Sequence, residues 1–147
     1  MDTQTINQIE NEIYNTVYTR RDLLLFYKEI DQLMDSIFRT DVDFEKAASS
    51  ILGELKKQKI EEYLKEKKID LKNFVELKEV LSKVKKLGET FPVVSLTLAF
   101  EPTEKILADI SFWFIKRIGQ KVILDIDYER ACIGGAFIAF EGKYKDY

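Results

Sequence analysis

The side chains that most often perform catalysis are scarce in this chain of 147 residues, which contains no histidine and a single cysteine, Cys132. Without imidazole, the chain has no Ser-His-Asp or Cys-His nucleophile and no zinc site of the histidine-containing kinds. A thiol with no base to activate it is typical of a small buried apolar residue rather than of a nucleophile. The composition therefore excludes several of the commonest hydrolytic and metal-dependent chemistries.

Two other features have residue types that could support chemistry. Asp125 and Asp127 are two positions apart in an apolar stretch, so in a strand both carboxylates point to one face and could transfer protons or hold Mg²⁺. Ile123 on that face is apolar and no third ligand follows, which favours a solvent-facing strand. Gly134-Gly135 lacks the spacing and the Lys-Ser/Thr ending of phosphate-binding loops, which favours a structural role. The sequence predicts no catalytic residue, no metal site and no cofactor.

The first part of the chain, residues 1–88, has the pattern of a helical bundle. Apolar residues recur every three or four positions, first in the stripe Ile6, Ile9, Ile13 and Val17. A break is expected near Thr19, where Asp22 follows at capping-box spacing, with one long helix as the alternative because no Gly or Pro separates the two stretches. Further helices are expected from Phe44 to Leu64 and after Asp70, with helix boundaries at Asp43, Asp70 and Gly88.

Lysines cluster along these helices, and such clusters invite a nucleic-acid interpretation. They alternate with glutamates, and the whole chain has 23 basic and 26 acidic side chains, a formal net charge of −3. Alternating charge is typical of a solvated helix face with ion pairs. The charge pattern therefore does not support binding to nucleic acid.

After Gly88 the pattern changes to that of a small mixed-sheet domain over residues 92–147. The stretch Val93–Phe100 alternates and is rich in β-branched residues, as in a strand, and a helix is expected from Pro102 to Gly119. Strands are expected at Lys121–Asp127 and Ala136–Phe140, and a turn at Gly142 leads to a last strand. The expected fold class is α+β, an N-terminal helical bundle followed by a β-α-β-β-β domain.

The helix of the second domain is apolar on nearly all sides at residues 110–115, where the sequence is Ile-Ser-Phe-Trp-Phe-Ile. A helix lying on one sheet needs a single apolar face. Two explanations stay open: the helical domain covers the additional apolar surface of Phe112 and Trp113, or a partner protein does.

The compartment is expected to be the cytoplasm. The first residues show neither the basic nor the apolar region of a secretory signal, and one cysteine suits a reducing environment. The longest apolar stretches are about eight residues, whereas a membrane-spanning helix needs about 20.

The carboxy-terminal third resembles a known family. The matching features are a strand opened by Phe91-Pro92-Val93-Val94-Ser95, an amphipathic helix, Lys121-Val122-Ile123-Leu124, Asp127, Ile133-Gly134-Gly135, an alternating strand, a turn at Gly142, and Asp146. Together they are similar to the carboxy-terminal domain of the delta subunit of F-type ATP synthases, the oligomycin-sensitivity-conferring protein of mitochondria. The resemblance covers about 55 of the 147 residues, and the helical first part agrees with the family's amino-terminal bundle in kind.

The resemblance implies a non-catalytic stator of a rotary ATP synthase, peripheral on the inner face of the plasma membrane through that complex. The helical bundle would hold the amino-terminal segment of an alpha subunit, and the second domain would hold the peripheral-stalk b subunits. By pattern alone, the candidate partner contacts are Ile6, Ile9, Ile13, Phe112 and Trp113. Gly134, Gly135 and Asp146 match the family motif and are expected to be structural.

Two other classes of protein remain as alternatives. A small domain with lysine-rich helices can bind RNA, although the strand motif of Lys/Arg, Gly and aromatic residues is missing. A helical adaptor using residues 43–87 would need sustained heptads, and the apolar stripe breaks at Ile69.

Overall fold

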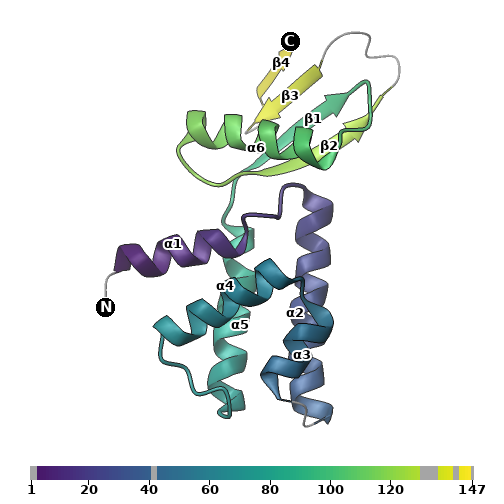
Figure 1. Ribbon diagram of the computed structural model, residues 1–147. Helices are drawn as coiled ribbons and strands as arrows, with labels where there is room; N and C mark the ends of the chain where they lie inside the picture. The colour runs from purple at the N-terminus through teal and green to yellow at the C-terminus, as the bar shows by residue number, and fades with distance from the viewer. Residues whose placement is uncertain (1–2, 41–42, 130–135, 141–142, 147) are drawn as a thin grey trace. The chain divides into compact units, whose positions relative to one another are not determined.

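The computed structural model describes residues 3–40, 43–129, 136–140 and 143–146 (Figure 1). Over these ranges the chain is mostly helical, with one four-stranded sheet in its second half. The elements are α1 (Thr3–Ile13), α2 (Arg20–Thr40), α3 (Phe44–Ile51), α4 (Glu54–Glu66), α5 (Phe74–Glu89), β1 (Val93–Leu98), α6 (Glu104–Ile118), β2 (Ile123–Tyr128), β3 (Ala136–Phe140) and β4 (Lys143–Asp146). The expected α+β class agrees with this content.

The chain divides into two compact units. The helical unit contains the residues up to 16 together with 25–90, and the sheet unit contains 17–24 together with the residues from 91 onward. Sequence patterning places the division at 88–92, so the assignment of 17–24 to the sheet unit is a departure from the expected boundary. Residues 17–24 belong to the sheet unit because their backbone forms a hydrogen bond with a strand that is far away in the sequence.

Short polar side chains set the starts of two helices, as expected. The Asp22 amide donates to the Thr19 hydroxyl at 3.1 Å, and the Thr19 amide donates back to the Asp22 carboxylate at 3.2 Å, which begins α2. Asp43 caps α3 by accepting the Lys46 amide at 2.8 Å. These contacts satisfy amide groups that have no partner within the first helical turn.

Two expected helix boundaries are wrong, and one break between helices was not expected. The single helix expected from Phe44 to Leu64 is interrupted at Leu52, whose backbone is extended, and α4 restarts after Gly53. The cap of α5 is Asn73, because Asp70 accepts the Lys72 amide in a turn before the helix. Gly88 lies inside α5, buried, and the helix continues to Glu89.

The core of the helical unit is formed by the apolar faces of its helices. Among its fully buried side chains are Ile13, Tyr14, Phe26, Ile30, Leu33, Ile60, Leu64, Leu77 and Leu81. The Tyr14 and Phe26 rings meet edge to face with centroids 5.2 Å apart. Helix α1 lies against α4. Burial of so many large side chains supplies the main stabilising term for this unit.

The sheet has the strand order β2-β1-β3-β4, with β1 and β2 parallel and the other pairs antiparallel. Helix α6 connects the parallel pair and lies along one face of the sheet (Figure 1). Alternation along β1 buries Val94, Leu96 and Leu98 and leaves the intervening side chains more exposed. The core between α6 and the sheet contains Val94, Leu96, Phe114, Val122 and Leu124.

The outer edge of β2 is met by residues that precede α2. The Leu124 amide donates to the Tyr18 carbonyl at 2.8 Å, and Thr19 forms a parallel bridge with Leu124. This pairing gives part of a sheet edge a backbone partner. It also explains why residues 17–24 belong to the sheet unit.

Candidate partner-binding surface

The exposed side of α6 is the most unusual surface of the sheet unit, and the caps of the helix fix its position. The Thr103 hydroxyl accepts the Ile106 amide at 3.3 Å, so Pro102 precedes the cap instead of opening the helix. Gly119 ends the helix in the left-handed conformation, with φ of 84°, and its amide bonds the Ile115 carbonyl. A glycine reaches that conformation without a steric penalty, as expected of the residue that ends α6.

The inner side of α6 packs on the sheet, and the outer side carries two large aromatic rings. Phe114 is buried, whereas the exposed fractions of Phe112 and Trp113 are 59% and 41%. The Trp113 ring meets Phe114 edge to face with centroids 4.9 Å apart, so Trp113 is anchored at the border of the core. The structure therefore places the predicted contact residues Phe112 and Trp113 at the surface.

Two cations accompany the exposed rings. The Lys116 ammonium lies 4.8 Å from the centre of the Phe112 ring, and the Arg117 guanidinium carbon lies 3.8 Å from the centre of the Trp113 ring. Both distances are within the range of cation–π attraction. These contacts were not predicted from the sequence, although the i, i+4 spacing of each pair on one helix is compatible with them. We call Phe112, Trp113, Lys116 and Arg117 the α6 outer face.

The stripe of α1 has a different environment. Ile9 and Ile13 are 4% and 1% exposed, because they belong to the face of α1 that is buried within the helical unit. Their prediction as accessible partner contacts is therefore wrong for this structure, in which the chain's own core occupies that face. Ile6 lies in α1, and its side chain is outside the described residues.

The family-motif residues are only partly described. Gly134, Gly135 and Cys132 lie outside the described residues, so their expected roles stay predictions. Asp146 is the last residue of β4, opposite Phe137 on β3. The alternating strand and the returning strand expected around the Gly142 turn are present as β3 and β4.

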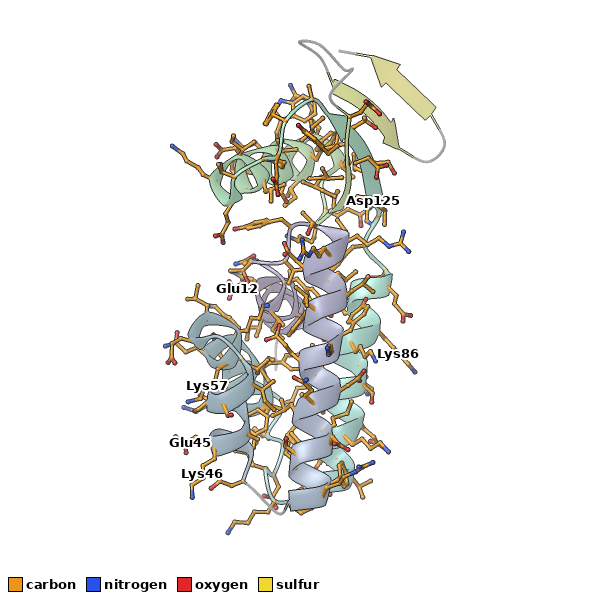
Figure 2. The ribbon with its side chains drawn as sticks, turned by 90° about the vertical axis from the view of Figure 1, so that its right-hand side faces the viewer. Glu12, Glu45, Lys46, Lys57, Lys86 and Asp125 are labelled. Carbon is orange, nitrogen blue, oxygen red and sulfur yellow. The ribbon has the colours of Figure 1, made fainter. Side chains whose placement is uncertain are left out.

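The two aspartates of β2 have an ordinary surface environment. Asp125 lies opposite Ser95 and Asp127 opposite Thr97 in the β1–β2 register. The Asp125 carboxylate lies 3.7 Å from the Arg20 guanidinium, with side chains 38% and 63% exposed (Asp125 is labelled in Figure 2). In the described part of the chain, no group of three metal-ligating side chains comes together.

Lys121, just before β2, is a partly buried base of the sheet unit. Burial lowers the pKa of Lys121 to about 8, and the neighbouring Asp22 carboxylate opposes the shift. Its ammonium lies 5.3 Å from the centre of the Tyr18 ring. A lysine with a lowered pKa can act as a nucleophile or base, but a perturbed pKa also occurs in purely structural settings. Lys121 lies where residues 17–22 meet β2, which indicates a structural role.

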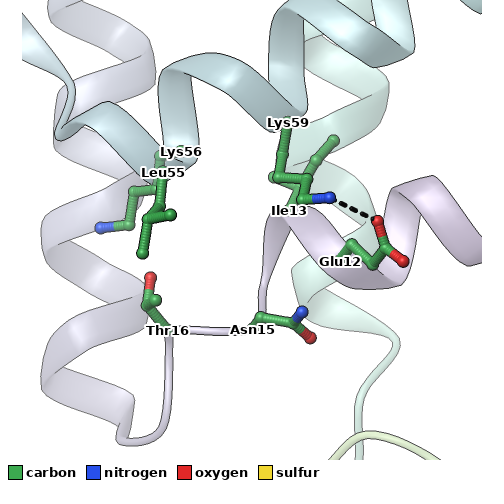
Figure 3. A pocket seen from close by; sticks show the side chains of 7 residues that line it. All are labelled: Glu12, Ile13, Asn15, Thr16, Leu55, Lys56 and Lys59. Carbon is green, nitrogen blue, oxygen red and sulfur yellow. Dashed lines mark hydrogen bonds and ion pairs between the residues drawn. The ribbon is translucent and has the colours of Figure 1, made fainter.

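A small cavity of about 80 Å³ lies in the helical unit (Figure 3). Its lining includes Glu12, Asn15, Thr16 and Lys59. Lys59 donates to Glu12 at 2.8 Å, so the two charged groups that face each other there are already paired. Pockets for drug-sized ligands are typically about 300–1,000 Å³. The cavity therefore does not have the dimensions of a cofactor site.

Four lysines of the helical unit form ion pairs with acids in the described residues, as alternating charge along the helices allows. The pairs are Lys56–Glu29, Lys57–Glu61, Lys59–Glu12 and Lys85–Asp31. Other charged side chains of this unit, including Glu45, Lys46 and Lys86, extend from its surface with mixed signs (Figure 2). This distribution differs from the continuous basic surface that nucleic-acid binding requires.

Comparison with known proteins returned no family model that matches the chain and no curated protein that matches it. Within the described ranges, no helix is long and apolar enough to cross a membrane.

Proposed function

We propose that this protein is a non-catalytic stator subunit of an F-type ATP synthase. In this role the helical unit binds the amino-terminal segment of an alpha subunit, and the sheet unit binds the b subunits of the peripheral stalk. The protein would lie on the inner face of the plasma membrane through that complex. Its task is mechanical, because it resists the torque of the rotor so that rotation drives ATP synthesis.

The observation that most supports this proposal is the sheet unit itself. Its described elements follow the order β-α-β-β-β at the positions that the resemblance implies, and its helix carries exposed aromatic rings at Phe112 and Trp113. Large aromatic residues are enriched where proteins bind other proteins.

A calorimetric titration of the full chain with a synthetic amino-terminal alpha-subunit peptide from the same organism tests the proposal. One-to-one binding that weakens little between low and high salt is expected, because a helix held in an apolar groove does not depend on charge. A scrambled peptide of the same composition is the control. Absence of heat at both salt concentrations would contradict the proposed function.

A matched variant separates the two units. Phe112→Ala removes an exposed ring of the sheet unit and is expected to leave binding of the alpha-subunit peptide unchanged. Binding that falls together with this substitution would contradict the assignment of the peptide to the helical unit.

A further inference from the structure

We propose that the α6 outer face binds an amphipathic helix that presents carboxylates. In this arrangement the partner's apolar residues cover the Phe112 and Trp113 rings, and its acidic residues face Lys116 and Arg117. The inference rests on the proposed function, because it specifies the chemistry of the stalk segment that the sheet unit binds.

The first argument is the geometry of the four side chains. Phe112 and Lys116 are one helical turn apart, as are Trp113 and Arg117, so two ring–cation pairs lie side by side on α6. The Arg117 contact, at 3.8 Å from the centre of the Trp113 ring, is a close stack. Each cation therefore rests beside an apolar ring, a combination that suits an amphipathic partner with apolar and acidic groups at neighbouring positions.

The second argument is charge. In the described part of the chain neither Lys116 nor Arg117 lies in a salt bridge with a carboxylate. The α6 outer face therefore has two adjacent positive charges without acidic partners within these ranges. Carboxylates from another molecule would complement them.

The third argument distinguishes a protein partner from an anionic membrane. Asp109 is exposed, and it lies three positions before Phe112 and four before Trp113, on the same side of α6. Its carboxylate would face anionic headgroups if the aromatic rings entered a lipid surface, and that contact is repulsive. A partner helix can place its acidic residues opposite Lys116 and Arg117 alone, so the mixed charge favours a protein.

The experiment uses Trp113, which is the sole tryptophan of the chain and part of the surface under test. The full chain is titrated with two synthetic peptides of 21 residues that share an apolar face of leucines, one with glutamates and one with lysines on its polar face. Vesicles containing phosphatidylglycerol form a third arm. Emission of Trp113 is expected to shift to shorter wavelength and saturate with the glutamate peptide only, because binding removes the ring from water.

Two variants test the residues. The double substitution Lys116→Glu with Arg117→Glu is expected to weaken binding of the glutamate peptide by about tenfold or more, since it replaces two attractions by repulsions. Asp109→Asn is the matched control on the same side of α6, and binding should be unchanged or tighter. Far-UV circular dichroism verifies that each variant keeps its helices.

Three results would overturn the inference. They are equal binding of the glutamate and lysine peptides, a stronger Trp113 response to vesicles than to the glutamate peptide, and no response to either peptide up to millimolar concentration. Binding of the alpha-subunit peptide is measured separately, by heat. If that peptide does not bind while the Trp113 emission still responds to the glutamate peptide, the proposed function is rejected and the inference about the α6 outer face is retained.

Discussion

Two apolar patterns in this chain were both predicted to contact a partner, and the structure gives their side chains opposite exposures. The stripe of α1 places Ile9 and Ile13 in the core of the helical unit, where they are 4% and 1% exposed. On α6 the apolar residues Phe112 and Trp113 are 59% and 41% exposed. Both patterns are consistent with partner binding by sequence, but only the second provides an accessible surface in the folded chain.

The difference follows from how many faces a helix must bury. Spacing of three and four residues produces one apolar face, and the neighbouring helices of a bundle cover it. Helix α6 has that face in Leu107, Ile110 and Phe114 and carries further apolar rings on its opposite side. A single stripe thus indicates a core, whereas on α6, which lies on one sheet, the apolar rings beyond that stripe remain exposed.

The largest expected effect is the difference in stability between truncating a buried side chain of α1 and truncating an exposed side chain of α6. Ile13→Ala should destabilise the protein by about 2–5 kcal/mol, because it removes buried atoms and leaves a cavity. Phe112→Ala should change the free energy of unfolding by about 0.5 kcal/mol or less, since its ring is mostly in water. Urea denaturation followed by far-UV circular dichroism measures both. Similar urea midpoints for the two variants would contradict the distinction between the buried stripe of α1 and the exposed rings of α6.

The two units are also expected to respond oppositely to alkali. In the helical unit, burial and, for Tyr63, a 2.7 Å hydrogen bond to Glu10 raise the pKa of Tyr14 and Tyr63 well above 10. In the sheet unit burial lowers the pKa of Lys121 to about 8. The first shift favours a neutral phenol in the folded state, and the second favours a neutral amine.

For the tyrosines, the unfolded chain releases phenolic protons near pH 10 while the folded chain retains them. Stability is therefore complete below pH 10 and falls as the pH rises beyond it, by about 1.4 kcal/mol per pH unit for each tyrosine. Tyr63→Phe should lower stability at neutral pH, through loss of the Glu10 hydrogen bond, and make the alkaline decline less steep. Urea midpoints between pH 9 and 11.5 measure both effects. An identical slope in the variant would show that Tyr63 ionises equally in both states.

For Lys121 the sign is reversed. Between its folded pKa of about 8 and the ordinary value of 10.5, the unfolded state holds a proton that the folded state has released, so this residue makes stability rise with pH in that window. The contribution is at most about 1.4 kcal/mol per pH unit. Lys121→Met should remove this rise, measured by Trp113 emission in urea from pH 7.5 to 10. A rise that persists in the variant would assign the effect to another group.

Local sequence signals predicted the parts of the fold that depend on neighbouring residues. The strands β1 and β3, the caps at Thr19 and Asp43, and the end of α6 at Gly119 all follow from residue types within a few positions. The break at Leu52 was not predicted, because Leu52 continues the apolar stripe and remains 6% exposed after leaving the helix.

Contacts between residues far apart in the sequence could not be predicted from local sequence signals. The bond between Leu124 and Tyr18, and the burial of Lys121, join segments about a hundred residues apart, and no periodicity encodes such pairing. The candidate surface was predicted in part. The crowding of apolar residues singled out Phe112 and Trp113 as contact candidates. The ring–cation contacts of Lys116 and Arg117 were not predicted, although their i, i+4 spacing is compatible with them.

A smaller effect on stability is expected at the start of α2. The first turn of this helix belongs to the sheet unit, and its remaining turns belong to the helical unit. Thr19→Ala removes the hydroxyl that accepts the Asp22 amide and should cost about 1 kcal/mol. Thr19→Ser keeps the hydroxyl and should restore most of that stability. Thermal unfolding of the three proteins measures the order, and a serine variant as unstable as the alanine variant would contradict a capping role.

The smallest effect is expected for Arg20 and Asp125, an ion pair of the sheet unit, in contrast to the several pairs that join helices in the helical unit. The groups are 3.7 Å apart and their side chains are 63% and 38% exposed, so water and salt screen the attraction. A double-mutant cycle with Arg20→Gln and Asp125→Asn should give a coupling below about 0.5 kcal/mol, because exposed pairs gain little net energy. We assign the attachment of residues 17–24 to β2 to the Leu124–Tyr18 backbone hydrogen bond and to the burial of Lys121. A coupling energy above about 1 kcal/mol would instead mean that the Arg20–Asp125 pair contributes to this attachment.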